Sequence, residues 1–281
     1  MAMERVSVEG AGGREELAVR VVGDGPPVLL VHGIPGSSGS WTEVVPGLVE
    51  AGHQVLVPDL LGFGASSRPR TVEGLWLDAQ SRALAAVLEA LAGGPALVLG
   101  HDFGAPISVD LARRAPARVS GLVLASGNLF TDTPIPLPLR YLRLPFVGTA
   151  AARVALSGPS LRLMLRFGSG RPRPWLDPSV YLGDRRQQAA IRTIFATALR
   201  ELESRYAEVE AALPGLGKPV VVLWGDRDPF FSFEEGRRTA SAIPGAELRV
   251  AEGAGHFLPA ERPHLFGEAV ARLNSAAEEP E

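Results

Sequence analysis

Short apolar runs alternate with helical stretches along most of this chain, and that alternation restricts the folds open to it. Residues 28–31 form a continuous apolar run, as expected of a strand that is buried on both faces. Similar runs recur at residues 55–57, 97–99, 122–124 and 220–223. Residues 75–91 instead place leucine and valine along one helical stripe. Strands that alternate with helices predict an α/β fold, with a mostly parallel central sheet flanked by helices.

The alternation stops between residue 130 and about residue 213, where no comparable strand run occurs. That segment opens with closely spaced prolines and then shows helical spacing, most clearly over residues 191–213. A stretch of about 80 residues is too long for a loop, so it is either a second small domain or a helical cap over a pocket. Because the strand pattern resumes afterwards, we expect an insertion. The predicted organisation is a core of residues 1–129 and 215–281 with a helical cap at 130–214.

Composition removes several classes of protein. The 281 residues carry a net charge of -3, so no global basic field favours nucleic acid as a partner. The chain has no cysteine, which excludes disulfides, thiolate nucleophiles and cysteine-bound metals. No apolar run approaches the ~18 residues that span a bilayer, and residues 1–10 lack the apolar region of a signal peptide. We therefore expect a cytoplasmic protein without stable membrane insertion, as a monomer or a homodimer.

The sequence also gives no sign of a bound cofactor. The histidines outside the motifs described below form no metal-ligand spacing. No glycine-rich dinucleotide fingerprint follows the first long strand. We expect a protein that needs neither a metal nor a cofactor.

The sequence GHDFG at residues 100–104 is the strongest chemical signal, because it directly follows a strand run and precedes a helical stretch. Glycines on both sides of a central residue let a strand turn sharply into a helix and lift one side chain above the sheet edge, as in a nucleophile elbow. The lifted residue here is Asp102, whose carboxylate the helix N-terminus would stabilise. The plainer alternative is an aspartate that only caps the helix.

Three further motifs stand at the ends of predicted strands. WGDRD supplies a carboxylate after the run at 220–223, GAGHF supplies His256, and HGIPG follows the run at 28–31, where an oxyanion-hole amide is required. A nucleophile, an acid and a histidine in this chain order match the hydrolase arrangement rather than the chymotrypsin or subtilisin orders. Each motif alone is also compatible with an ordinary turn, but four such motifs at four strand ends favour a catalytic site.

Together these segments make the chain resemble the α/β-hydrolases, and in particular the branch with an aspartate nucleophile. That branch includes epoxide hydrolases, haloalkane dehalogenases and fluoroacetate dehalogenases. The resemblance rests on HGIPGSSGSW, PDLLGFGASS, GHDFGAP, WGDRDPF and GAGHFLPAERP, and it covers nearly the whole chain outside the predicted cap. It implies Asp102 as nucleophile, Asp228 as the acid and His256 as the base. It also implies an oxyanion hole built from the backbone amides of Ile34 and Phe103.

An aspartate nucleophile suits attack on saturated carbon. A serine oxygen would leave an unreactive ether there, whereas a carboxylate leaves an ester that water can cleave. Asp102 is ionised near neutral pH, so its attack needs no base, and His256 would activate water in the second step. Asp228 would hold the histidine in the required tautomer. The family's acid usually stands third after the Trp-Gly pair, so Asp226 is expected to be a turn residue.

The leaving group separates the two main chemistries. An epoxide oxygen needs a proton donor, usually a cap tyrosine in this family, whereas a halide needs N–H donors. Haloalkane dehalogenases usually carry tryptophan and often asparagine where this chain has Phe103 and Ile34, and the arginine pair of fluoroacetate dehalogenases is missing. Tyr141 and Tyr206 are the candidate proton donors, against the alternative of packing tyrosines. Trp175 is a weaker candidate for a halide donor.

We therefore predict an epoxide hydrolase, which converts an epoxide and water to a vicinal diol through an ester on Asp102. Haloalkane dehalogenation is the alternative, and an esterase or lactonase is a further one. A binding protein on the same scaffold is the last alternative, because a fold does not fix a function. The substrate is expected to be small and hydrophobic or amphiphilic. Seven arginines and no acid lie between Thr133 and Leu176, which fits a solvated helix face or, less readily, a cap mouth for an anionic substrate.

Overall fold

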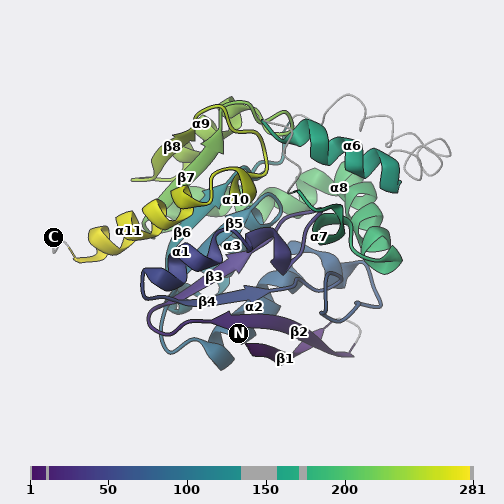
Figure 1. The fold of residues 1–281 in the computed structure, drawn as a ribbon, viewed down its shortest axis with the longest axis horizontal. Coiled ribbons are helices and arrows are strands. Elements are labelled where there is room, and N and C mark those ends of the chain that lie inside the picture. Colours follow the sequence, from purple (N-terminus) through teal and green to yellow (C-terminus); the bar gives the residue numbers. More distant parts are fainter. Residues whose placement is uncertain (1, 11–12, 134–156, 171–175, 279–281) are drawn as a thin grey trace.

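An eight-stranded sheet forms the centre of the computed structural model, which describes residues 2–10, 13–133, 157–170 and 176–278 (Figure 1). The strands follow the order β1-β2-β4-β3-β5-β6-β7-β8 across the sheet. Their bounds are Ala2–Gly10 for β1, Gly13–Val22 for β2, Pro27–Val31 for β3, Gln54–Pro58 for β4, Ala96–His101 for β5, Val119–Ala125 for β6, Val220–Gly225 for β7 and Glu247–Ala251 for β8. Strand β2 is antiparallel to β1 and β4, and the other neighbours are parallel. The predicted α/β fold is confirmed.

Helices cover both faces of the sheet. Strand β3 shows why, because Leu29 and Val31 enter one hydrophobic cluster while Val28 and Leu30 enter another, and all four are fully buried. The first cluster includes α2 (Leu77–Leu91), α3 (Gly104–Arg114) and α9 (Phe233–Ala242). The second includes α1 (Val45–Glu50) and α11 (His264–Glu278), and the short α10 (Leu258–Glu261) lies just before α11. The apolar runs in the sequence are therefore strands buried between two helical layers.

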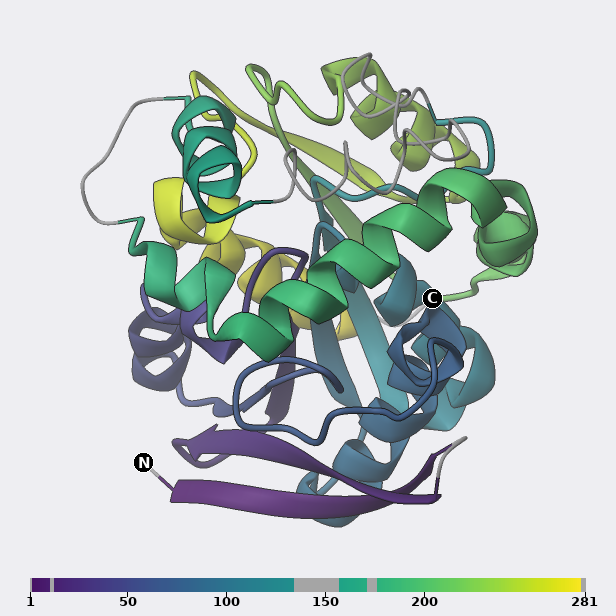
Figure 2. The same ribbon diagram turned by 90° about the vertical axis from the view of Figure 1, so that its right-hand side faces the viewer.

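Within the described residues, three α-helices lie between β6 and β7, where the strand pattern of the sequence is interrupted. They are α6 (Gly158–Gly168), α7 (Pro178–Leu182) and α8 (Arg185–Ala212). The carboxylates of Asp177 and Asp184 cap the first backbone N–H groups of α7 and α8. Helix α8 runs across the molecule in Figure 2 and is interrupted by non-helical dihedral angles at Glu201, with φ -121° and ψ 21°. These helices fall within residues 130–214, and the predicted cap boundaries stay a prediction.

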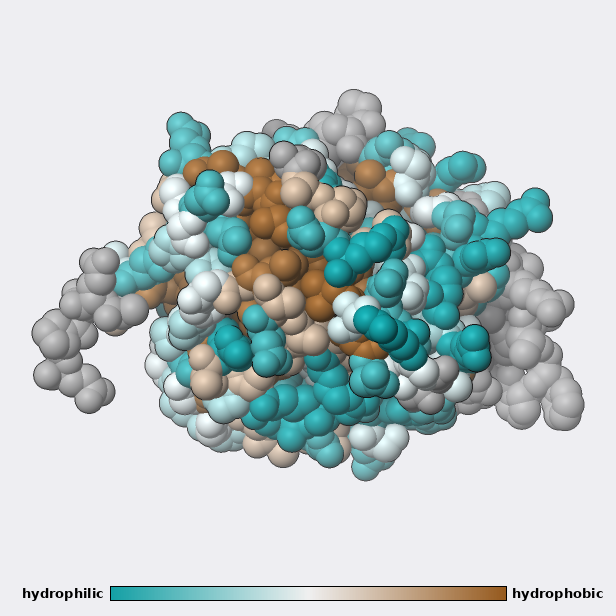
Figure 3. All heavy atoms as spheres, turned by 90° about the horizontal axis from the view of Figure 1, so that it is seen from below, coloured by the Kyte–Doolittle hydropathy of each residue, from teal (hydrophilic) through white to brown (hydrophobic). Residues whose placement is uncertain are grey.

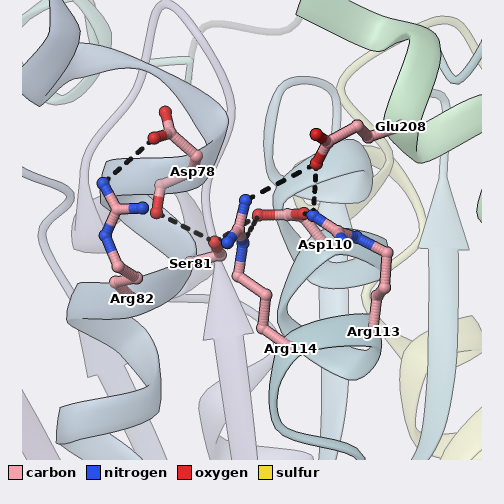
Figure 4. A network of polar contacts seen from close by, with 7 residues as sticks. All are labelled: Asp78, Ser81, Arg82, Asp110, Arg113, Arg114 and Glu208. Atoms are coloured by element: carbon pink, nitrogen blue, oxygen red, sulfur yellow. Dashed lines mark hydrogen bonds and ion pairs between the residues drawn. The ribbon is translucent and has the colours of Figure 1, made fainter.

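A polar network attaches α8 to the core helices (Figure 4). Its centre is Asp110 on α3, which is 2% exposed and accepts hydrogen bonds from Ser81 on α2 and from Arg113 and Arg114 on its own helix. Arg113 also donates to Glu208 of α8 over 2.6 Å. A buried carboxylate that is paired with two guanidinium groups and a hydroxyl stays charged, so this junction fixes the C-terminal half of α8.

Few large hydrophobic side chains of the described residues are more than one third exposed. Figure 3 shows one face on which hydrophobic residues gather in the middle and hydrophilic residues surround them, as on many folded proteins. Among the described residues, the exposed large hydrophobic side chains are Met3, Leu163, Phe167 and Val250. No helix in the described part of the chain has the length and apolar character required to cross a membrane.

Candidate active site

Asp102 sits on the sharp turn between β5 and α3. Its φ of 53° lies in the left-handed region, which is unusual for a residue other than glycine and costs free energy. The turn is held because the Asp102 N–H donates to Ala125 O over 3.0 Å and its carbonyl accepts from Ala105 N over 3.1 Å. The Asp102 carboxylate does not cap α3, whose N-cap residue is Phe103; instead it accepts the Ile34 N–H over 2.7 Å. The carboxylate therefore reaches from the sheet edge toward the loop after β3.

Gly104 allows this turn to lie against the sheet. A Cβ atom at this position would collide with the backbone carbonyl oxygen of Val31, which cannot move aside as a flexible side chain would. The last glycine of GHDFG is thus required by the close approach of α3 to β3.

His256 lies between two carboxylates. Its Nδ1 is 2.9 Å from Oδ2 of Asp228, and its Nε2 is 3.4 Å from Oδ1 of Asp102. The other oxygen of Asp228 accepts backbone N–H groups of Phe230 over 2.8 Å and Phe231 over 3.0 Å. The Asp228 side chain is fully buried, and that of Asp102 is 13% exposed. The structure thus brings together the three residues that the sequence predicted as nucleophile, acid and base.

The two carboxylates determine the charge of this histidine. Burial alone disfavours the imidazolium ion, but the charge of Asp228 and the hydrogen bond to Asp102 outweigh burial and raise the pKa of His256 to about 10. Burial also raises the pKa of Asp102, but the hydrogen bond and charge of His256 outweigh it and leave that pKa below its ordinary value. At neutral pH the site therefore holds an ionised Asp102 beside a protonated His256.

Two further motif histidines hydrogen-bond the backbone around the site. His101 Nε2 donates to the carbonyl of His256 over 2.7 Å; burial, with the neighbouring His256 charge, lowers the pKa of His101 to about 4, so it is neutral. His32 Nδ1 donates to Gly33 O over 2.9 Å, and its Nε2 accepts the Leu60 N–H over 3.0 Å. Burial lowers the pKa of His32 as well. Both rings therefore act as neutral connectors between loops.

The structure also separates the two carboxylates of WGDRD. Asp226 accepts the backbone N–H of Gly253 over 2.7 Å and so holds the turn that precedes the histidine loop. Asp228, in contrast, faces the imidazole. Phe103 is buried, and its ring meets Trp76 edge to face with centroids 6.1 Å apart. Its amide as a second oxyanion donor stays a prediction.

Tyr206 lies on α8, beyond the bend, and is 5% exposed. Burial and the nearby charge of Asp102 raise the pKa of Tyr206, so its hydroxyl keeps its proton at all ordinary pH values. Tyr206 belongs to the hydrophobic cluster that also includes Ile34 and Phe103. The other candidate donors, Tyr141 and Trp175, lie outside the described residues.

Several residues that organise the site were not singled out from the sequence. Gln187 of α8 is 2% exposed; its Nε2 donates to Gly36 O and its Oε1 accepts from Gly64 N, each over 3.0 Å. Ser37 donates to the backbone carbonyl of Val180 over 2.8 Å. These bonds join the loop after β3 to α7 and α8. A polar residue on a helix gives no sequence signal that it will bind a loop about 150 residues away.

The described residues fit acid–base and nucleophilic chemistry. Within them, no group of three or more His, Cys, Asp or Glu side chains has an arrangement that would hold a metal ion. The available groups are an ionised carboxylate, an imidazole between two acids, a backbone N–H on the first carboxylate and a neutral phenol nearby. Such a set can attack an electrophile, stabilise a developing oxyanion and move protons.

Comparison with known proteins places this chain among hydrolases. The model of one protein family, described as alpha/beta hydrolase fold, matches residues 26–263. Epoxide hydrolase A of Mycobacterium tuberculosis is 29% identical over 302 residues, covering 91% of this chain and 92% of that protein. A haloalkane dehalogenase of Mycolicibacterium paratuberculosis is 28% identical over 245 residues, covering 85% of this chain and 80% of that protein. The solved structure of a thermophilic esterase from Thermogutta terrifontis matches with a TM-score of 0.79 and 25% identity, covering 98% of this chain and 99% of the esterase chain.

Proposed function

This chain belongs to the α/β-hydrolase fold family; it is a hydrolase, and we propose that it opens epoxides through a covalent ester on Asp102. One observation carries the proposal: the residue on the strand–helix turn is an aspartate, 3.4 Å from a histidine that a second, buried aspartate holds. A carboxylate in this place forms an ester with a saturated carbon, and the histidine serves to hydrolyse it. The relatives named as epoxide hydrolase and haloalkane dehalogenase support an aspartate nucleophile in this chain.

In the first step, a carboxylate oxygen of Asp102 attacks one carbon of the epoxide and the bond from that carbon to the ring oxygen breaks. The ring oxygen becomes a hydroxyl by taking the proton of Tyr206, whose neutral state its raised pKa ensures. Formation of the ester removes the negative charge of Asp102. With one of its two anionic partners gone, His256 becomes a weaker base and releases its proton, which returns Tyr206 to the neutral form.

In the second step, the neutral imidazole of His256 takes a proton from water, and the resulting hydroxide attacks the carbonyl carbon of the Asp102 ester. The backbone amide of Ile34, which donates to this carboxylate over 2.7 Å, would stabilise the oxyanion together with the amide of Phe103. Collapse of the intermediate expels the diol alkoxide, which takes the proton from His256. The carboxylic acid left on Asp102 returns its proton to His256, which restores the ionised Asp102 beside a protonated His256. The balance is one epoxide and one water consumed for one diol.

The protein is proposed to bind its substrate between this site and the inserted helices, which we propose as a cap spanning residues 130–214. The proposed proton donor Tyr206 lies on α8. Gln187 and Ser37 join α8 and α7 to the loop that carries Ile34. Phe103 offers no side-chain N–H to a halide, which favours an epoxide as substrate. The proposed substrate is small and hydrophobic or amphiphilic.

Haloalkane dehalogenation is the second candidate, and one observation favours it. The indole N–H of Trp76 is buried without a hydrogen-bond partner in the described part of the chain, and its ring contacts that of Phe103. An N–H group of this kind is what a departing halide requires. A substitution of Trp76 by phenylalanine that abolishes halide release would favour this candidate.

Intact mass spectrometry of a His256→Gln variant tests the proposal. Ester formation should proceed while hydrolysis fails, so an epoxide should add its full mass to the chain and a haloalkane its mass less HX. His264→Gln, at an exposed histidine outside the site, is the matched control and should turn over normally. A double variant that also carries Asp102→Asn should gain no mass. The proposal would be contradicted by an adduct that still forms in the double variant. It would also be contradicted if neither epoxides nor haloalkanes give an adduct in the His256→Gln variant.

A further inference from the structure

Glu261 is a buried acid that the chemistry above leaves unused. It ends α10, is 5% exposed, and its carboxylate accepts three backbone N–H groups. Two of them belong to Gly255, over 2.9 Å, and Phe257, over 3.2 Å, the residues on either side of His256. The third belongs to Gly170, over 3.0 Å, just beyond α6. One side chain therefore binds both flanks of His256 and the inserted segment together.

The inserted segment also contacts the histidine loop directly. The backbone N–H of His256 donates to the carbonyl of Gly168 over 2.7 Å. A Cβ atom at Gly255 would collide with that same carbonyl, and a Cβ atom at Gly170 would lie 2.7 Å from Gly255 N. The two loops thus meet backbone to backbone, with no room for a side chain between them.

We propose that Glu261 is a positioning residue for His256, and that it makes the placement of the imidazole depend on contact with the inserted segment. A buried carboxylate offers only acceptors, and this site presents three donors to it. A glutamine would turn one oxygen into an NH₂ group that faces an N–H, and an aspartate is one methylene shorter. Asp228 orients the ring through Nδ1, whereas Glu261 fixes the backbone from which the ring extends. The expected effect of Glu261 on turnover rests on the proposed function, whereas its effect on the position of His256 does not.

The consequence falls on the second chemical step. Asp102 is held mainly by its own turn and by Ile34, so its attack on substrate should depend less on Glu261 than water activation does. Water activation depends on where the imidazole stands, and a displaced base loses about 10- to 100-fold in rate. A Glu261→Gln variant should therefore accumulate the Asp102 ester, with a slowed hydrolysis step and a nearly unchanged first step.

The test compares Glu261→Gln with Glu252→Gln, which removes one charge from an exposed position in the same loop. Circular dichroism and thermal unfolding establish that both variants fold. The imidazole N–H signal of His256 is then recorded by NMR in ¹⁵N-labelled protein and assigned by its loss in His256→Gln. We expect the signal to shift or broaden in Glu261→Gln and to stay in place in Glu252→Gln. An unchanged signal in a folded Glu261→Gln variant would overturn the positioning role.

A second variant keeps the inference testable if Glu261→Gln does not fold. Gly170→Ala places a methyl group against Gly253 O and Gly255 N from the inserted side and leaves Glu261 intact. It should move the same His256 signal, and an unmoved signal would overturn the dependence on the inserted segment. These spectra need no substrate. Failure of the epoxide proposal, seen as absence of any adduct, is therefore distinct from failure of this one.

Discussion

Asparagine at position 102 should lower the pKa of His256 by several units, because it copies the uncharged state that the proposed ester creates. The substitution keeps the shape of the side chain and removes its charge. In the wild-type protein the Nε2 of His256 is 3.4 Å from that charge. The imidazolium would then retain only Asp228 as an anionic partner, against an unchanged cost of burial.

The size of the shift follows from that distance. Two unit charges 3.4 Å apart interact by about 5 kcal/mol at an effective dielectric constant of about 20. Since one pKa unit corresponds to about 1.4 kcal/mol, full loss of the interaction amounts to about 3 to 4 units. Starting from a pKa of about 10 for His256, the variant should titrate within about one unit of the ordinary histidine value of about 6.5. The imidazole would thus change from a charged partner to a usable base near neutral pH.

An NMR titration of the His256 ring measures this directly. Asp226→Asn is the matched control, since that carboxylate lies in the same motif but binds Gly253 rather than the imidazole, and it should leave the midpoint near its wild-type value. The same reasoning predicts that the rate of ester hydrolysis rises with pH through the lowered pKa of His256 in the ester intermediate. This pKa lies well below the pKa of His256 in the free enzyme. A midpoint in Asp102→Asn that stays within half a unit of the wild type would refute the electrostatic account.

Three further predictions concern stability and the first chemical step. Gly104→Ala should lower the free energy of unfolding by about 3 kcal/mol in urea titrations, because its methyl group meets a backbone oxygen. Gly47→Ala, which has open space in α1, should instead gain about 0.5 to 1 kcal/mol, and equal losses in both would contradict the packing argument. Asp110→Ala should cost about 1 to 3 kcal/mol by the same measurement, since the buried Ser81 hydroxyl and two partly exposed guanidinium groups lose their buried acceptor. Tyr206→Phe should slow formation of the ester by about 10²- to 10⁴-fold in single-turnover experiments with an epoxide and leave ester hydrolysis nearly unchanged; rapid ester formation in this variant would exclude Tyr206 as the proton donor.

The sheet and the approach of Asp102 to His256 were predictable because their signals are local. A strand buried on both faces must be apolar throughout, and the runs at β3 and β7 show this directly. The glycines of GHDFG similarly predict a tight turn at the end of a strand. Parallel strands then bring such turns to one edge of the sheet, so Asp102 and His256 meet although 154 positions separate them.

The connections between the inserted helices and the core were not predictable in the same way. Gln187 and Glu261 act through backbone groups that belong to distant loops, and backbone groups carry no sequence signature. The bend at Glu201 likewise occurs in a helical pattern without proline or glycine at that point. The contacts of Gln187 and Glu261 and the bend at Glu201 both depend on how the inserted helices pack on the loops of the core. Tertiary contacts of this kind emerge only from the folded chain.

The attachment of α8 has a consequence for how this protein can be adapted. Gln187 fastens one end to the loop after β3, and Glu208 fastens the other end to α3. Because both ends of α8 are attached to the core, the helix cannot move as a rigid body. Its direction can change only at Glu201, where the helical dihedral angles are interrupted. Tyr206 lies five residues after this interruption in α8. Substitutions around Glu201 would therefore change the position of the Tyr206 hydroxyl, while the contacts of Gln187 and Glu208 and the turn that carries Asp102 stay as they are.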